Sequence, residues 1–253
     1  MSAVLEKIDE PEQGLSSTTP LVLIHDGSGT IFHYYMLGPL NRTVYGVAYP
    51  YFDNQTMPPG GLHQLATEYA EAIRETIGKG SVIVGGWSFG GNISLEISRI
   101  LEADSCLNVT GLLMIDTYCP WPAETYQTTQ PLKPSFREST IQKTKDKVKR
   151  SYENARNMLL SWEKPPTFSV PRAVMIRASN TTLETDSSIN SRLLQDTNDQ
   201  LGWSEYRSVH FLSTIDVPGN HFNMFDDSML DNLTEKINVA CIMLEEAILS
   251  HTI

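Results

Sequence analysis

The chain has 253 residues, 40% of them hydrophobic, and a formal net charge of −11. That length and composition suit one large domain with a sizeable buried core, and the acidic balance argues against a nucleic-acid partner, because phosphate binding favours a basic surface. No apolar run approaches the length that spans a membrane, residues 1–18 contain no apolar signal-peptide core, and the three cysteines form no motif, so we expect a cytoplasmic protein with no membrane partner.

The predicted elements alternate along the chain. Residues 1–19 end in Ser-Ser-Thr-Thr before Pro20, which predicts a flexible leader or linker ahead of a folded domain at 20–253. Short continuous apolar runs, typical of buried parallel strands, lie at 21–24, 44–48, 82–85, 111–116, 173–177 and 211–217. Helices are expected at 62–77, 91–103, 138–161, 189–201 and 228–249. Strands that alternate with helices predict an α/β fold with a mainly parallel sheet covered by helices on both faces.

The segment at about 120–166 interrupts this alternation. Its first part, residues 120–136, is rich in Pro, Gln and Thr, its second part is strongly charged, and Pro165-Pro166 closes it. We interpret the segment as a lid inserted over the functional site, and a long surface excursion is the alternative.

The strand expected at 82–85 runs directly into Gly86-Trp87-Ser88-Phe89-Gly90, a G-x-S-x-G pattern followed by a helix. This arrangement predicts a nucleophile elbow, a sharp turn that lifts the serine hydroxyl above the sheet. Gly86 and Gly90 remove side chains that would collide where strand and helix approach closely. The N–H of Phe89, at the helix N-terminus, is a candidate oxyanion-hole donor. A glycine-rich turn with an ordinary serine is the alternative.

A serine hydroxyl becomes a good nucleophile when a base takes its proton. In α/β-hydrolases that base follows the nucleophile in sequence, on a loop after the last strand. His221 has this position, because Val217 ends the expected strand and a Pro-Gly turn follows. The remaining histidines are less suitably placed, either before the serine, before the last strand or in the terminal tail: His25, His33, His63, His210 and His251.

The histidine needs an acid that selects its tautomer and stabilises its charged form. Asp116 ends the strand expected after the elbow helix, and carboxyl ends of parallel strands meet at the active-site edge of such a sheet. The usual hydrolase position follows the strand near 173–178, where the first carboxylates are Glu184 and Asp186. We favour Asp116, with Asp186 as the second candidate.

A second oxyanion-hole donor is expected from the glycine-containing loop after the first strand, His25-Asp26-Gly27-Ser28-Gly29. Glycines let the backbone approach a substrate carbonyl, so the N–H of Gly27 is the candidate and Ser28 stands next to it. A phosphate-binding loop is disfavoured, because neither G-x-G-x-x-G nor a suitably spaced lysine is present.

The sequence resembles the thioesterase domains of polyketide and non-ribosomal peptide synthases, most of all fungal members. The resemblance is carried by four stretches: the glycine-containing loop after the first strand, the G-x-S-x-G pattern, Met114-Ile115-Asp116 and the Val-Pro-Gly-Asn-His-Phe run at 217–222. The resemblance covers about residues 19–250 and implies an α/β-hydrolase fold. It supports Asp116 over Asp186, because the family places its acid after the strand that follows the elbow helix. The family often has Tyr or His where this chain has Trp87, which implies an altered pocket wall.

The resemblance implies a serine-dependent thioesterase with the triad Ser88, Asp116 and His221. Its substrate would be a polyketide-type acyl chain on the phosphopantetheine arm of an acyl carrier protein, released through an acyl-serine ester by water or by a hydroxyl or carbon nucleophile. No metal or redox cofactor is expected, and Trp87, Ser28 and Tyr118 are expected at the substrate. A general carboxylesterase or lipase acting on small soluble esters, and a non-catalytic binding module, are the alternatives.

The charged part of the expected lid is basic in an otherwise acidic chain. Because carrier proteins are generally acidic, this patch would steer docking of the partner, and a solvated helix face is the alternative. It comprises six side chains: Lys143, Lys145, Lys147, Lys149, Arg150 and Arg156.

Overall fold

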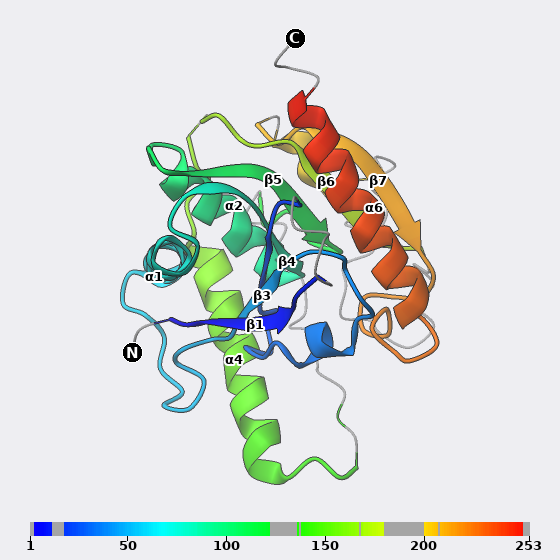
Figure 1. Cartoon of the computed structure of the whole chain (residues 1–253). Coiled ribbons are helices and arrows are strands. Elements are labelled where there is room, and N and C mark those ends of the chain that lie inside the picture. Colours follow the sequence, from blue (N-terminus) through cyan, green and yellow to red (C-terminus); the bar gives the residue numbers. More distant parts are fainter. Residues whose placement is uncertain are drawn as a thin grey trace.

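A computed structural model describes residues 3–11, 18–121, 136, 138–166, 168–179, 200–206 and 208–249 of the chain. Within these residues, seven strands form one sheet in the order β1-β3-β2-β4-β5-β6-β7 (Figure 1). Every neighbouring pair is parallel except β1 and β3, so the predicted mainly parallel sheet is confirmed. The strands are β1 Leu5–Asp9, β2 Leu21–Ile24, β3 Val44–Val47, β4 Gly80–Trp87, β5 Leu107–Ile115, β6 Ala173–Ala178 and β7 Phe211–Val217.

Helices cover both faces of this sheet (Figure 1). Helices α1 and α2 pack together, with α2 against β2, β4 and β5, while α6 packs against β5, β6 and β7. The helices are α1 Gly61–Ile77, α2 Phe89–Leu101, α4 Gln142–Ser161 and α6 Leu230–Leu249, with 3-10 turns η1 Phe32–Met36 and η2 Trp203–Glu205. Within the described ranges, no helix combines the length and apolar character needed to cross a membrane. Most of the helix expected at 189–201 lies outside the described residues.

The central strands are apolar on both faces, which is why they appear in the sequence as continuous hydrophobic runs. In β2, Val22 and Ile24 belong to the core formed with α1 and α2, whereas Leu21 and Leu23 belong to the core formed with α6. All four side chains are 0% exposed. Successive side chains of a strand point to opposite faces, so one short run supplies both cores.

The prediction of a flexible leader at 1–19 is wrong for residues 5–9, which form strand β1 at the edge of the sheet. The Asp9 carboxylate accepts a hydrogen bond from the backbone N–H of Leu40 at 3.0 Å. Ile8 occupies the space left by Gly46, where a Cβ atom would lie 2.6 Å from the Ile8 methyl. Because polar residues face solvent on this edge strand, its sequence has no continuous apolar run like those that identify the central strands. Residues 12–17 lie outside the described part.

The expected lid contains one described helix, α4, which begins at Gln142 within the predicted charged stretch. Residues 122–135 and 137 lie outside the described part of the chain. The two ends of the segment meet, because the Trp121 and Trp162 rings lie 4.5 Å apart and Trp121 Nε1 donates to the Trp162 carbonyl at 3.2 Å. Within α4 itself, Asn154 Nδ2 donates to the Thr56 carbonyl at 3.2 Å. Trp121 and Trp162, near the two ends of the expected segment, therefore lie side by side.

Candidate active site

The turn between β4 and α2 carries Ser88, as predicted from the glycine pattern. Its backbone has φ 55° and ψ −117°, a combination that non-glycine residues rarely adopt and that persists where surrounding contacts enforce it. One such contact is the hydrogen bond from the Ser88 N–H to the Ile115 carbonyl at 2.8 Å. Ser88 is the N-cap of α2, so its side chain lies at the positive end of the helix dipole.

Glycines on both sides of Ser88 are required by the neighbouring strand β2. A Cβ atom at Gly86 would lie 2.6 Å from the carbonyl oxygen of Ile24, and one at Gly90 would collide with the same oxygen. A Cβ atom at Gly90 would also lie 2.8 Å from the carbonyl oxygen of His25. The loop after β2 therefore passes beside the elbow, which brings its backbone close to the start of α2.

Asp116 directly follows β5 and has a positive φ of 43°. Its carboxylate is buried, with the residue 1% exposed. Oxygen Oδ1 accepts the backbone N–H of Ala178 at 2.9 Å, and Oδ2 lies 2.7 Å from Nδ1 of His221. Both oxygens are thus held by partners far away in sequence. The second candidate acid, Asp186, lies outside the described residues.

His221 is presented by a tight loop after β7. The Asn220 side chain accepts the N–H groups of Phe222 and Asn223 at 2.9 and 3.1 Å, which makes an Asx turn around the histidine. The Asn220 N–H in turn donates to the Asn223 side chain at 2.6 Å. The Pro-Gly turn was predicted from the sequence, whereas this Asx turn was not, although the Asn-x-x-Asn spacing is its signal.

Aromatic rings fix the imidazole of His221 beside the elbow. The ring centroids of Trp87 and Tyr118 lie 5.5 and 5.7 Å from that of His221. The Trp87 ring also packs on Phe225, at 5.0 Å, and the residue is only 4% exposed. Trp87 therefore belongs to the core beneath the histidine, where its ring contacts the candidate base. Tyr118 is half-buried and remains accessible from the surface.

The loop after β2 is stabilised by its own side chains. Ser28 is 7% exposed, and its Oγ donates to Oδ1 of Asp26 at 2.5 Å while accepting the N–H of Thr30 at 3.1 Å. The Ser28 hydroxyl is thus engaged inside the loop. Gly27 makes no hydrogen bond through its N–H to any residue that the structure describes. The N–H of Phe89 is likewise outside the intrahelical pattern, because it belongs to the first turn of α2.

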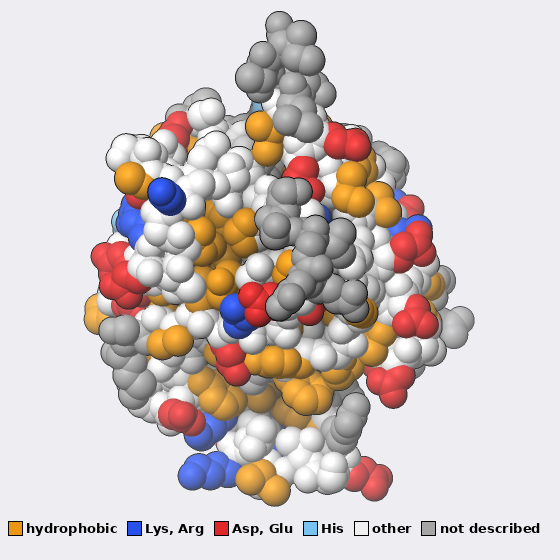
Figure 2. Space-filling model, in the orientation of Figure 1, with side chains coloured by type: hydrophobic (Ala, Val, Ile, Leu, Met, Phe, Trp, Pro, Cys, Tyr) orange, Lys and Arg blue, Asp and Glu red, His pale blue; other side chains and the backbone are white. Residues whose placement is uncertain are grey.

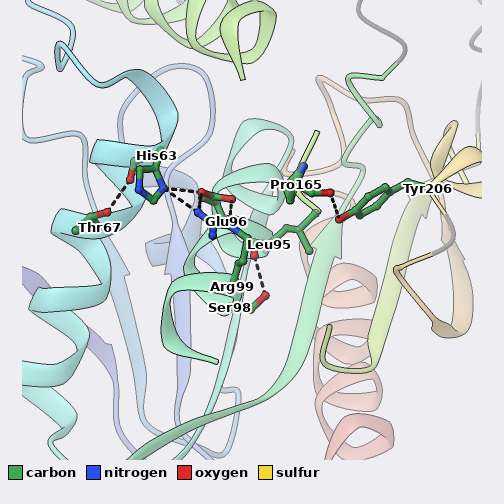
Figure 3. Close-up of polar contacts among 8 residues, drawn as sticks. All are labelled: His63, Thr67, Leu95, Glu96, Ser98, Arg99, Pro165 and Tyr206. Atoms are coloured by element: carbon green, nitrogen blue, oxygen red, sulfur yellow. Dashed lines mark hydrogen bonds and ion pairs between the residues drawn. The ribbon is translucent and has the colours of Figure 1, made fainter. Parts of the chain in front are cut away.

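A separate cavity of about 690 Å³ lies between α1, α2 and the residues that follow α4. Its polar wall contains His63, Glu96 and Arg99 (Figure 3). Arg99 donates to both carboxylate oxygens of Glu96, at 2.6 and 3.0 Å, and His63 Nδ1 lies 2.7 Å from Glu96 Oε1. Burial opposes ionisation of Glu96, but these hydrogen bonds outweigh it and hold the pKa of this carboxyl below its usual value. Since Glu96 lies two turns beyond Ser88 on α2, about 12 Å along the helix, we treat this cavity as distinct from the candidate active site.

Several known proteins similar to this chain are described as thioesterases. The family described as "Thioesterase domain" matches residues 19–241. The chain is 31% identical over 256 residues to the "Probable thioesterase gloN" of Glarea lozoyensis, covering 88% of this chain and 89% of that protein. It is 42% identical over 111 residues to the "Nonribosomal peptide synthetase imqB" of Aspergillus flavus, covering 44% of this chain and 3% of that protein. The solved NocB thioesterase domain from the Nocardicin cluster has a TM-score of 0.65 at 23% identity and covers 94% of this chain and 98% of its own, which confirms the predicted α/β-hydrolase fold.

Proposed function

The chain belongs to the thioesterase domain family, and on that premise we propose that Ser88, His221 and Asp116 form its catalytic triad. It is a hydrolase that releases an acyl chain from a thioester, and the similar proteins do not favour a general carboxylesterase or lipase. The observation that carries the proposal is the buried hydrogen bond between His221 Nδ1 and Asp116 Oδ2, at 2.7 Å. The His221 ring lies 5.5 Å from that of Trp87, the residue directly before Ser88 in the strand-to-helix turn.

The hydrogen bond with Asp116 assigns the two nitrogens of His221 to different tasks. A carboxylate accepts, so Nδ1 carries the proton and Nε2 has a free lone pair. The second Asp116 oxygen accepts the N–H of Ala178, which prevents the carboxylate from turning away. Nε2 is then the base for the Ser88 hydroxyl, and Asp116 stabilises the imidazolium that forms.

The reaction proceeds in two halves. His221 takes the Ser88 proton while Oγ attacks the thioester carbonyl, the C–S bond breaks, and the imidazolium returns the proton to the departing sulfur. An acyl-Ser88 ester remains. Water, or a hydroxyl or carbon nucleophile of the chain itself, then attacks this ester with His221 again as base, and the Ser88 hydroxyl is restored. These steps use only side chains and backbone groups of the protein, so we propose no metal or redox cofactor.

The tetrahedral oxyanion of each half is stabilised by the N–H groups of Phe89 and Gly27. Phe89 supplies the positive end of α2, and Gly27 lies on the loop that passes the elbow. Of the residues expected at the substrate, Tyr118 lies half-buried beside His221 and is the best candidate for contact with the acyl chain. Ser28 supports the loop, and Trp87 supports the histidine.

We propose that the acyl chain arrives on the phosphopantetheine arm of an acyl carrier protein. The similarity to part of a non-ribosomal peptide synthetase supports this partner. The basic side chains of α4 supply a surface suited to an acidic carrier.

Intact-protein mass spectrometry with a panel of acyl-pantetheine thioesters tests the proposal. Wild-type protein is expected to gain the mass of one acyl group and release product, whereas Ser88→Ala is expected to gain none. A panel of nitrophenyl esters, assayed in parallel, distinguishes thioester release from general esterase activity. Acylation of Ser88→Ala at the wild-type rate would overturn the assignment of the nucleophile.

The acid is tested with a matched pair of variants. Asp116→Asn is expected to lower kcat by about 10³–10⁴-fold, because the amide stabilises the wrong tautomer of His221. Asp186→Asn makes the same chemical change at the second candidate acid and is expected to keep kcat within about twofold. The reverse ranking would transfer the role of acid to Asp186.

A further inference from the structure

The lid helix α4 touches the loop that carries the candidate oxyanion donor. The Tyr152 hydroxyl donates to Oδ2 of Asp26 at 3.0 Å, a contact between residues 126 positions apart. The Tyr152 ring packs on Gly27, where a Cβ atom would lie 2.8 Å from the ring carbons. One side chain of the lid therefore meets both the backbone of the donor residue and its neighbouring carboxylate.

The Asp26 carboxylate is a buried junction, with the residue 2% exposed. Its Oδ1 accepts the Ser28 hydroxyl and its Oδ2 accepts the Tyr152 hydroxyl. The Asp26 carbonyl accepts the N–H of Gly29 at 3.0 Å, which closes the turn that contains Gly27. Removal of one donor from a buried carboxylate leaves a lone pair unsatisfied, so the turn depends on both hydroxyls.

A second contact of α4 reaches the other end of this turn. Gly29 has φ +80°, and a Cβ atom there would lie 3.0 Å from the Ser151 hydroxyl. Consecutive residues of the lid thus press on both sides of the turn. Burial and the neighbouring Asp26 carboxylate raise the pKa of Tyr152 well above its usual value, which keeps the phenol protonated and able to donate.

We propose that Tyr152 is a positioning residue, which acts through Asp26 to hold the Gly27 N–H in the oxyanion hole when the lid helix is seated. The inference rests on the proposed function and deepens it, since it links the lid to the chemical step. A seated α4 completes the Asp26 junction and orders the turn. A displaced α4 removes one donor and frees the turn, so the protein stabilises an oxyanion best when its lid is closed.

Tyr152→Phe tests this role, because it removes the hydroxyl and keeps the ring on Gly27. On an acyl-pantetheine thioester, kcat is expected to fall about tenfold with KM within about twofold, because a misplaced oxyanion donor affects the transition state more than substrate binding. Tyr51→Phe is the matched control. It removes a phenol that donates to the Glu68 carboxylate at 2.7 Å, a bond of the same kind outside this loop, and it should leave kcat unchanged.

A double-mutant cycle shows whether Tyr152 acts through Asp26. Asp26→Asn alone is expected to lower kcat by a similar factor, and adding Tyr152→Phe should then cost less than about twofold more. If the kcat losses of the two single variants multiply in the double variant, or if Tyr152→Phe leaves kcat unchanged, the inference is overturned and the proposed triad is unaffected. Full activity of Ser88→Ala would instead overturn the proposed function, so the two failures are distinguishable.

Discussion

His25 is a buried histidine that the proposed reaction does not use. It is 1% exposed, its Nδ1 lies 2.7 Å from the Asp26 carbonyl, and its Nε2 lies 2.7 Å from the Tyr69 hydroxyl. Burial lowers the pKa of His25 to about 4. The ring is therefore neutral at physiological pH, and its two nitrogens connect the loop after β2 to helix α1.

The lowered pKa makes stability depend on pH in a defined direction. Below about pH 6.5 the unfolded chain binds a proton at His25, but the folded chain does so only near pH 4. The free energy of unfolding therefore falls as the pH drops through this window, by about 2 kcal/mol between pH 7 and pH 5 from this group. Urea denaturation at pH 7 and at pH 5 gives the free energy of unfolding at each pH. The decrease from pH 7 to pH 5 should be about 2 kcal/mol smaller in His25→Gln than in wild type. An identical difference in both proteins would contradict the assignment.

At the level of elements, the edge strand β1 packs through two apolar side chains, Leu5 against the core formed with α1 and α2 and Ile8 on the other face. Ile8 packs against the core between the sheet and α6 and against Gly46, whereas Lys7 is exposed and pairs with Glu10 at 3.1 Å. The strand was not identifiable from composition, because an edge strand buries few side chains. Its place in the sheet is determined by pairing with β3, a contact between segments distant in sequence.

Two substitutions in β1 test its contribution to the fold. Ile8→Asp places a charge against the core and is expected to lower the free energy of unfolding by about 2–4 kcal/mol. Lys7→Thr changes the adjacent exposed residue and should stay within about 0.5 kcal/mol of wild type. Urea denaturation at one pH provides both values. Equal effects of the two variants would mean that β1 does not contribute packing to the folded state.

Over the whole molecule, the basic surface of α4 is smaller than its sequence indicates. Lys147 is engaged by Asp53 at 2.5 Å, and Arg150 pairs with Glu153 at 3.1 Å. On the face shown in Figure 2, acidic side chains are spread widely, while Lys and Arg also occur at the lower end over α4. Lys143 and Lys149 are exposed and are the better candidates for steering an acidic carrier.

Charge reversal at these two positions tests the docking surface. Lys143→Glu with Lys149→Glu is expected to lower kcat/KM for carrier-bound substrate about tenfold at low salt and not for an acyl-pantetheine thioester. High salt should reduce the difference, because it screens exposed charges. Lys79→Glu with Lys236→Glu changes the net charge equally at positions away from α4 and should have little effect. Equal losses in the two double variants would argue against α4 as the docking surface.

Local sterics and hydrophobic patterning allowed much of the fold and the elbow to be predicted from the sequence. A run such as Leu21–Ile24 is apolar on both faces only in a central strand, and glycines flank Ser88 because backbone atoms lie where side chains would be. Both signals are local patterns that a few consecutive residues of the sequence display. The same reasoning placed Asp116 and His221 at strand ends, and the alternative Asp186 stayed open.

Only the tertiary structure brought Asp116 and His221, 105 residues apart, to within a hydrogen bond. It also buried Trp87 beneath the histidine and set Tyr152 on the loop of Asp26. Such contacts depend on which surfaces lose water when distant segments pack, and burial changes both the cost of an unsatisfied polar group and the pKa of a titratable one. The spacing of residues in the sequence therefore determines the order and type of the strands and helices. Which groups become partners of the buried polar side chains is determined by packing across the whole chain.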